Sequence, residues 1–248
     1  MDRLLELTHR AERDHFWFRG FRAFVAPVLA QAMQGRPRGP VLDCGCGTGV
    51  NLPLLAPYGA AVGCDITWRG LAFARQDAAR VLQGSVAGLP FGDATFALVA
   101  SFDVFSALPD AVEQQGIREV ARVLKPGGAA VLTVAALDML HGAHSRLACE
   151  TRRFTPARLR ALVTAGGLVP ERVTFTHAAI FPLVLAARLG DRLTGAASTA
   201  DNDEWELAVP PAPVNAVLTA ALMAEAALLR VVNMPIGSSL VCVARKPQ

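Results

Sequence analysis

The chain has 248 residues, of which 52% are hydrophobic, and its formal net charge is +3. A chain of this length can bury a substantial core, either in one large domain or in one domain with a subdomain. Its basic residues form no run with interleaved aromatic side chains, so we expect no nucleic-acid partner.

The cysteines and the hydropathy of the chain indicate the cellular compartment in which the protein is expected. The five cysteines are an odd number without a repeating spacing. Cys44 and Cys46 form one close pair, but no second pair stands at zinc-ligand spacing, so we expect reduced thiols and no metal site. The charged N-terminus lacks the apolar core of a signal peptide, and no segment resembles a spanning helix. These features predict a cytoplasmic protein.

The first 34 residues are predicted to be helical from residue 2 onward, with aromatic side chains concentrated at residues 15–18. Two interpretations fit this cluster: a hydrophobic staple on the core, or a lid in which Trp17 and Arg19 close over a bound cofactor. A linker rich in proline and glycine follows at 35–40. We therefore treat residues 1–38 as an N-terminal helical lid.

Residues 41–49 read Val-Leu-Asp-Cys-Gly-Cys-Gly-Thr-Gly, an apolar strand that enters a glycine-rich turn. Alternate glycines let a ligand lie directly on the main chain, facing the free N–H groups of the next helix. The dinucleotide fingerprint requires G-x-G-x-x-G, and Val50 stands where its third glycine belongs, so the spacing is wrong for NAD. The carboxylate of Asp43 would repel a pyrophosphate and attract an ammonium group. A cationic cofactor is therefore predicted.

This stretch resembles motif I of the class I S-adenosylmethionine-dependent methyltransferases, in which such a loop packs against the methionine end of the cofactor. The resemblance implies that S-adenosyl-L-methionine is the cofactor. The cofactor-binding residues implied in this loop are Asp43, Cys44, Gly45, Gly47 and Thr48.

Residues 60–66 repeat the pattern of an apolar strand that ends in an acid, Asp65, placed 22 residues beyond Asp43. In nucleotide-binding α/β units the acid at this position accepts hydrogen bonds from the ribose hydroxyls. We therefore predict that Asp65 binds the ribose and that the adjacent Ile66 also contacts the cofactor. A helix is predicted over residues 68–82.

Residues 84–91 and 96–100 look like the third and fourth strand signals of the methyltransferase family. The family usually places an acid at the position of Ser85, where it accepts a hydrogen bond from the adenine amino group. A serine hydroxyl makes a weaker contact, so we expect adenine to be read by Ser85 together with backbone groups around Val86.

The carboxyl end of the fourth strand, residues 101–106, lies where open α/β sheets bind ligands. Ser101 and Phe102 are therefore predicted to contact the cofactor. Asp103 has two interpretations, a functional acid or a helix N-cap or solvated loop residue, and we favour the second because aspartate often caps helices.

An amphipathic helix is predicted over residues 110–124, followed by Lys-Pro-Gly-Gly at 125–128 and a strand over 129–135. This tetrad resembles the family's Leu-Lys-Pro-Gly-Gly. The motifs over residues 41–135 share the order and spacing of the family. They imply an α/β, Rossmann-like fold with a seven-stranded, mostly parallel sheet, helices on both faces, and an antiparallel last strand between the fifth and sixth.

His141 and His144 fall in a loop after the fifth strand, at the same edge of the sheet. Either could act as a general base, although such histidines are more often ordinary loop residues. Thr155 and Pro156 then predict a helix start, and glycines 166 and 167 its end, before a sixth strand over 168–176.

The last third of the chain is the least similar to the family. Residues 178–236 are predicted to be a helical insertion that shapes the substrate site or forms an oligomer contact, with a helix from Val214 to about Val232. Residues 237–248 supply the last strand, and residues 39–177 form the remaining cofactor-binding core.

Together these features predict a methyltransferase that moves a methyl group to a small hydrophobic or lipid-linked acceptor, with peripheral contact to a membrane. Two alternatives stay open. One is a cofactor-binding protein without catalysis. The other is an NAD-dependent oxidoreductase, which would need a third glycine and a Tyr-x-x-x-Lys motif, whereas Tyr58 is followed four residues later by Val62. The atom that is methylated and the oligomeric state are not specified by the sequence.

Overall fold

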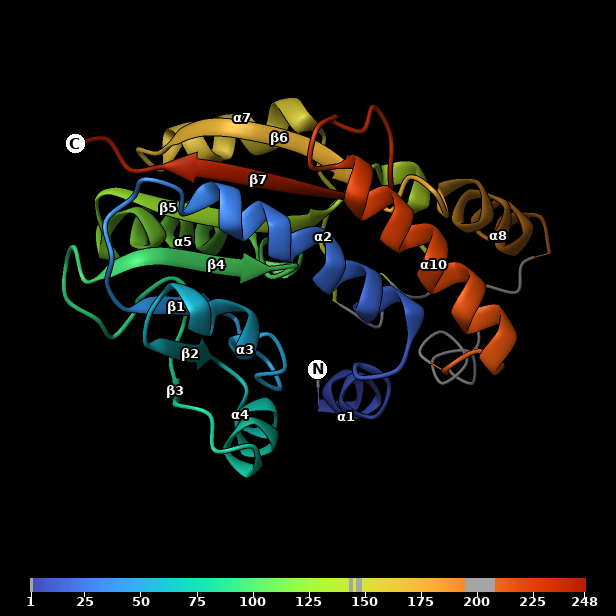
Figure 1. Cartoon of the computed structure of the whole chain (residues 1–248), viewed down its shortest axis with the longest axis horizontal. Helices are drawn as coiled ribbons and strands as arrows, with labels where there is room; N and C mark the ends of the chain where they lie inside the picture. The colour runs from blue at the N-terminus through green and yellow to red at the C-terminus, as the bar shows by residue number, and fades with distance from the viewer. Residues whose placement is uncertain (1, 143–144, 146–148, 195–207) are drawn as a thin grey trace.

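A computed structural model describes residues 2–142, 145, 149–194 and 208–248 (Figure 1). Within these residues, one seven-stranded sheet has the order β3-β2-β1-β4-β5-β7-β6. Its strands are β1 (Val41–Cys44), β2 (Ala61–Asp65), β3 (Val81–Gln83), β4 (Phe96–Phe102), β5 (Leu124–Ala135), β6 (Val169–Thr176) and β7 (Ser239–Arg245).

The last strand is antiparallel to both of its neighbours. In register, Cys242 of β7 pairs with Leu132 of β5 and with Val173 of β6. All other pairs, from β3 through β5, are parallel. The predicted fold class, with an antiparallel last strand between the fifth and sixth, is confirmed.

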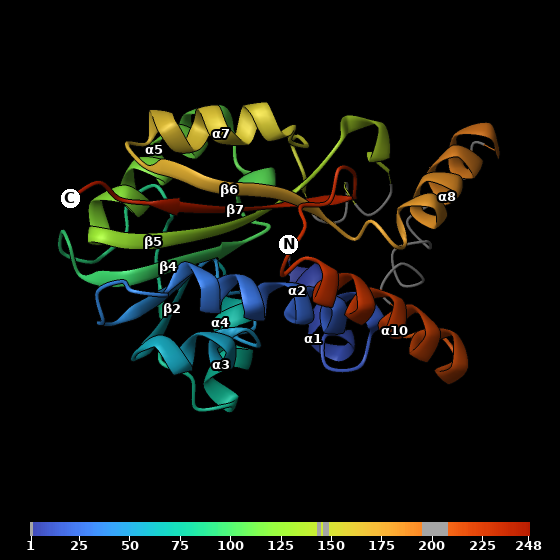
Figure 2. The same ribbon diagram turned by 45° about the horizontal axis from the view of Figure 1, so that its top comes forward.

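Helices cover both faces of the sheet, as Figure 2 shows. On one face, α5 (Asp110–Val123) and α7 (Pro156–Ala165) bury Ile117 and Leu159 against the strands. On the other face, α2 (Phe16–Ala32) and α3 (Leu52–Leu55) bury Val28 and Leu55. Because the strands are covered on both sides, they are apolar almost throughout. The polar groups needed for chemistry are therefore confined to the ends of the strands.

The remaining helices lie near the carboxyl ends of the parallel strands or at the β3 edge. They are α1 (Asp2–Ala11), α4 (Trp68–Gln76), α8 (Phe181–Thr194) and α10 (Ala212–Leu228), with the short 3₁₀ helices η2 (Phe105–Ala107) and η3 (Asp138–Leu140). A third 3₁₀ helix, η1 (Ala56–Tyr58), directly precedes β2 at the amino end of that strand. No helix in the described part of the chain combines the length and the apolar character needed to cross a bilayer.

Several predicted boundaries were wrong. The predicted helix over 2–34 is broken between α1 and α2, where His15 caps α2 by accepting a hydrogen bond from the N–H of Trp17 at 3.2 Å. The predicted helix over 68–82 ends at Gln76, because Ala78 takes a left-handed conformation (φ 56°) that reverses the chain into β3. The third strand thus precedes the stretch at 84–91 that was assigned to it.

The two terminal regions meet beside the sheet, where α10 runs along α2 (Figure 1). Their backbones approach closely because Gly20 has no side chain, and a Cβ there would lie 2.4 Å from Leu222 Cδ1. The Asn215 side chain accepts a hydrogen bond from the N–H of Phe16 (2.8 Å) and donates one to the carbonyl of Asp14 (2.9 Å). The C-terminal insertion is therefore attached at the junction between α1 and α2.

Candidate cofactor and acceptor site

The turn after β1 requires its glycines. Gly45, Gly47 and Gly49 all have positive φ (84°, 52° and 79°), a region that disfavours other residues. A Cβ at Gly45 would lie 2.1 Å from Val104 Cγ2, and one at Gly49 would lie 2.8 Å from Ala74 Cβ. Side chains at these positions would collide with the neighbouring segments. The glycines therefore let Val104 and Ala74 pack directly on the backbone of the loop at the carboxyl edge of the sheet.

Asp43, at the base of this loop, is a buried acid. The residue is only 1% exposed, and neither oxygen of its carboxylate makes a hydrogen bond to a described residue. Burial, with a smaller contribution from the nearby Asp65, raises the pKa of Asp43 from 3.8 to about 7. An uncompensated buried acid is costly, so the site fits an incoming cation or hydrogen-bond donor. The ammonium group of S-adenosyl-L-methionine has that chemistry.

Asp65 ends β2 beside the loop. Its carboxylate accepts hydrogen bonds from the N–H groups of Gly47 and Thr67, each at 2.8 Å, and from the Thr67 hydroxyl. A carboxylate has about four acceptor positions, so at least one stays open for a ribose hydroxyl. The next residue, Ile66, is 65% exposed and offers an apolar surface beside this acid.

The predicted adenine-side residues follow β3. The N–H of Gly84 donates to the carbonyl of Asp65 at 2.9 Å, which holds the segment with Ser85 and Val86 against the end of β2. Both residues are half-buried, and the Ser85 hydroxyl accepts a hydrogen bond from the N–H of Ala87 at 3.2 Å. Their contact with adenine stays a prediction.

Three other predicted cofactor residues have structural partners. The buried Ser101 hydroxyl donates to the carbonyl of Cys44 at 2.8 Å, which ties β4 to β1. Cys44 itself is 1% exposed within the core. Phe102 packs edge-on against Phe21 of α2, with ring centroids 5.2 Å apart. A direct role of these residues in cofactor binding stays a prediction.

Helix α1 reaches the glycine loop through a residue that sequence reasoning missed. Glu12, only 2% exposed, accepts a hydrogen bond from the Thr48 hydroxyl at 2.6 Å and lies 3.2 Å from Nδ1 of His9. Ion pairs from Glu6 to Arg69 and from Arg13 to Asp77 join the same N-terminal segment to α4. The only available signal in the sequence was an acid shortly before the aromatic cluster, which is common in helices.

The aromatic cluster has a different partner. Trp17 stacks on His177 at the end of β6, with ring centroids 4.1 Å apart and ring planes within 8°. Burial lowers the pKa of His177 from 6.5 to about 3. Arg19 is exposed on α2. The Trp17 ring thus packs against β6, while Glu12, five residues earlier, is the side chain that reaches the glycine loop.

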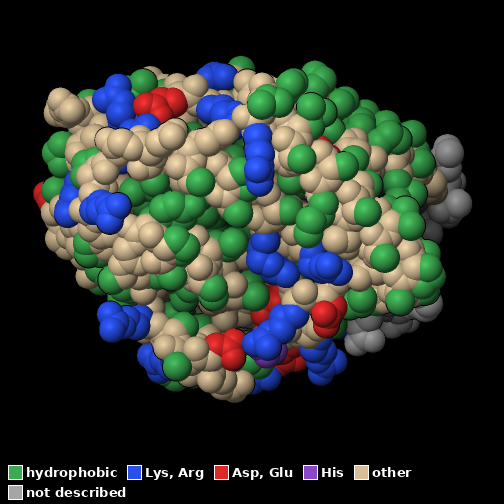
Figure 3. Space-filling model, in the orientation of Figure 1, with side chains coloured by type: hydrophobic (Ala, Val, Ile, Leu, Met, Phe, Trp, Pro, Cys, Tyr) green, Lys and Arg blue, Asp and Glu red, His purple; other side chains and the backbone are tan. Residues whose placement is uncertain are grey.

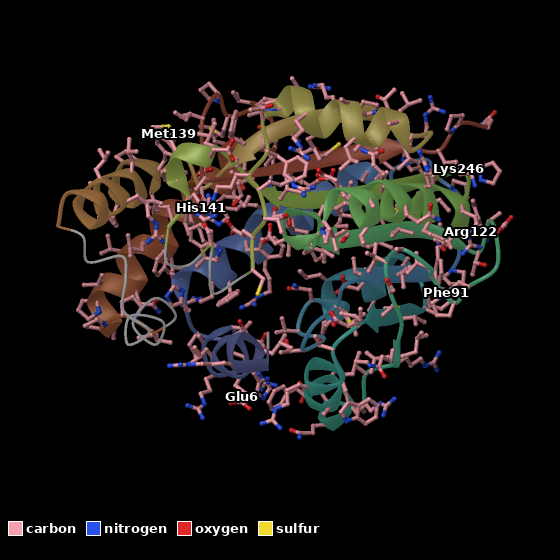
Figure 4. The ribbon with its side chains drawn as sticks, turned by 180° about the vertical axis from the view of Figure 1, so that it is seen from behind. Glu6, Phe91, Arg122, Met139, His141 and Lys246 are labelled. Carbon is pink, nitrogen blue, oxygen red and sulfur yellow. The ribbon has the colours of Figure 1, made fainter. Side chains whose placement is uncertain are left out.

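Figure 4 places His141 beside α8, at the opposite end of the sheet from Phe91, Arg122 and Lys246. His141 is exposed and follows η3, and its role as a base stays a prediction. His144 lies outside the described residues. At the far end, Arg122 binds Glu119 and the Phe91 carbonyl, so this group is a structural network distant from the glycine loop.

Asp103 is not a helix N-cap. The 3₁₀ helix η2 begins at Phe105, and its capping residue Val104 makes no side-chain bond. Asp103 is exposed, has φ 60°, and its carboxylate accepts a hydrogen bond from the Thr133 hydroxyl at 3.1 Å. The capping interpretation is therefore wrong, whereas the solvated loop residue, favoured together with it, agrees with the exposed position of Asp103.

Known proteins resemble this chain. The family model for a methyltransferase domain matches residues 41–128. A probable S-adenosylmethionine-dependent methyltransferase of Mycolicibacterium smegmatis is 33% identical over 67% of this chain and 65% of its own length. A demethylmenaquinone methyltransferase of Corynebacterium kroppenstedtii is 39% identical over 46% of each chain, so this match spans about half of that relative.

A malonyl-[acyl-carrier protein] O-methyltransferase of Herminiimonas arsenicoxydans is 31% identical over 76% of this chain and 77% of its own. Among solved structures, phosphoethanolamine N-methyltransferase 2 of Haemonchus contortus, in complex with S-adenosyl-L-methionine, has a TM-score of 0.58 at 18% identity, covering 89% of this chain and 51% of that one. The structural likeness supports the fold alone. With the glycine loop, the two acids at the strand ends and these relatives together, the chain belongs to the class I S-adenosylmethionine-dependent methyltransferases.

Proposed function

We propose that the protein transfers the methyl group of S-adenosyl-L-methionine to a small hydrophobic or lipid-linked acceptor. The observation that carries the cofactor half of this proposal is Asp43 at the base of the glycine loop, a fully buried acid that has no hydrogen-bond partner among the described residues. When bound, the cofactor supplies an electrophilic methyl group on a sulfonium centre. The protein then has to bind the cofactor, align the acceptor with the carbon–sulfur bond and keep water away from the methyl group.

The residues around the loop divide this task. Asp43 would pair with the cofactor's ammonium group, and Asp65 would accept from its ribose hydroxyls. The glycine loop, whose positive φ angles require residues without side chains, would lie against the methionine end of the cofactor. Helix α1 would act as a lid, since the bond between Glu12 and Thr48 holds its end against the loop. In this arrangement α1 excludes water from the cofactor.

The acceptor class is inferred from the exposed sides of α8 and α10. Leu183 is 57% exposed and Val217 is 68% exposed, and green apolar side chains gather over α10 in Figure 3. Glu225, the one charged residue of α10, is buried and accepts hydrogen bonds from the N–H groups of Ala178 and Ala179. Apolar helix surfaces of this kind are typical of contacts with lipids or other apolar partners.

Two relatives are named for their acceptors, demethylmenaquinone and malonyl-[acyl-carrier protein]. These names are in line with a small apolar or carrier-linked acceptor. We further propose that the protein meets such an acceptor through peripheral contact of α10 with a membrane surface. His141 and His144 stay the candidate general bases for an acceptor that must lose a proton.

The experiment is a transfer assay with methyl-labelled S-adenosylmethionine and separated organic and aqueous fractions of bacterial extract. We expect label to enter compounds of the organic fraction, and an Asp65→Ala variant to transfer much less at low cofactor concentration. Label confined to aqueous products would overturn the acceptor class. Tight cofactor binding without transfer to either fraction would support a binding protein without catalysis.

A further inference from the structure

A small cavity lies between α2 and the neighbouring ends of β4, β5, β7 and β6. Its wall is apolar on the side of α2, through Phe21, Phe24 and Val25, and its other side carries Asp103, Thr133, Thr176, Ser239 and Val241. The space that it encloses suits about one water-sized group. A hydroxyl or an amine has about this size, so one such group at the end of a larger molecule would fit the cavity.

Asp103 is held in one orientation at this cavity. Its left-handed backbone is unfavourable for a residue with a side chain, although aspartate tolerates it better than most. The N–H of Asp103 donates to the carbonyl of Thr133 at 3.0 Å, and the Thr133 hydroxyl donates to Oδ1 of Asp103 at 3.1 Å. Such conformations occur at sites where the surroundings impose them. Here β5 imposes the direction of the carboxylate.

The same residue adjoins the cofactor loop. Val104, next in the chain, packs so closely on Gly45 that a Cβ there would touch it. Asp103 thus lines the small cavity, and the next residue contacts the loop that would hold the methionine end of the cofactor. His141 has no comparable link to this loop in the contacts described above, since it follows η3 beside α8.

We propose that the cavity receives the reacting group of the methyl acceptor, a hydroxyl or an amine, and that Asp103 accepts its hydrogen. This inference rests on the proposed methyl transfer. In the step, the O–H or N–H bond of the acceptor breaks and its proton moves to a carboxylate oxygen of Asp103. The lone pair of the acceptor forms the bond to the methyl carbon, and the electron pair of the broken carbon–sulfur bond stays on sulfur. Thr133 is a positioning residue that aims the carboxylate.

The test uses sinefungin, a cofactor analogue that carries an amine where the transferred methyl group stands, and S-adenosylhomocysteine, which carries nothing there. If Asp103 faces this position, its carboxylate binds the amine, and sinefungin should bind the wild-type protein at least about tenfold more tightly than S-adenosylhomocysteine in calorimetry. Asp103→Asn should remove this preference and leave S-adenosylhomocysteine affinity unchanged. Asparagine also tolerates the left-handed backbone, so the variant should fold.

Two further variants make the result specific. Thr133→Val keeps the shape of the side chain but removes the hydroxyl, and it should reduce the preference for sinefungin partly. Asp138→Asn is the matched control, because Asp138 is an exposed acid at the same end of the sheet that accepts a hydrogen bond from the N–H of Arg153. It should keep the full preference.

The outcomes separate the two claims. Failure of wild-type protein to bind S-adenosylhomocysteine would contradict the proposed function. Normal binding with no preference for sinefungin, or with the same preference in Asp103→Asn, would overturn the role of Asp103 and leave the cofactor assignment intact. Loss of the preference in Asp138→Asn alone would assign the amine contact to the loop after β5.

Discussion

The protonation of Asp43 should control cofactor binding, and this is the most direct physical consequence of the site. A pKa raised from 3.8 to about 7 corresponds to about 4 kcal/mol of disfavoured ionisation in the buried, empty position. Without ligand, the folded protein therefore keeps this proton below about pH 7, while the unfolded chain releases it near 3.8. Asp43 thus lowers stability as the pH rises between these two values.

A cationic cofactor reverses this preference, because it binds the ionised form. Binding at pH 6 should release close to one proton, and affinity should fall as the pH is lowered. If the complex keeps Asp43 ionised, the loss between pH 7 and pH 5 is about 50-fold, since the ionised fraction of the free protein falls from about one half to about one hundredth. Over this range the cofactor's own ammonium group stays protonated.

The assay is calorimetry of S-adenosylhomocysteine in buffers of different ionisation enthalpy, which counts the protons released. Asp43→Asn cannot ionise and should show neither proton release nor the pH dependence. Asp93→Asn, at the opposite end of the sheet, is the matched control and should behave as wild type. An affinity that is constant between pH 5 and pH 7, or equal proton release in Asp43→Asn, would refute the reasoning.

Other parts of the structure give further predictions. Asp65→Ala should weaken S-adenosylhomocysteine binding by roughly 1.5–3 kcal/mol in calorimetry, because the ribose loses a charged acceptor, and unchanged affinity in a folded variant would assign the ribose elsewhere. Glu12→Ala should speed cofactor release in stopped-flow measurements, since α1 loses its bond to Thr48, and an unchanged rate would argue against the lid. The pKa of His177 is lowered from 6.5 to about 3, so only the unfolded chain takes up this proton as the pH falls from 6.5 toward 3. The free energy of unfolding should therefore fall by about 1.4 kcal/mol per pH unit over this range. In urea unfolding, it should fall more steeply with decreasing pH in wild type than in His177→Phe. If His141 is the base, His141→Gln should lower turnover by roughly two to four decades at unchanged cofactor affinity, and normal turnover would favour Asp103 or alignment alone.

The order of the sheet could be predicted from the sequence because its signals are local. The strand that leads to Asp43 and the strand that ends in Asp65 can each be recognised from a few consecutive residues, and the family motifs indicate the order of the strands. The boundary at residues 77–83 was not predictable in the same way. Two adjacent apolar residues, Val81 and Leu82, fit the end of a helix as well as a short strand.

The contacts that shape the site depend on distant segments. Glu12 and Thr48 are 36 positions apart, and Phe16 and Asn215 are 199 positions apart. No local pattern in the chain indicates that these residues meet. The orientation of Asp103 is likewise set by Thr133 of another strand, and the sequence alone indicated only a helix cap or a solvated loop residue.

The attachment of α10 at the break between α1 and α2 has a thermodynamic consequence. The two hydrogen bonds of Asn215 end on Asp14 and Phe16, the residues on either side of the point about which α1 would swing. A displacement of α10 by an acceptor that lengthens either bond would change the freedom of α1, and with it the affinity for the cofactor. By linkage, the cofactor would alter acceptor affinity by the same factor. The cofactor and the acceptor would then influence each other's binding through the side-chain amide of Asn215, although neither ligand contacts it.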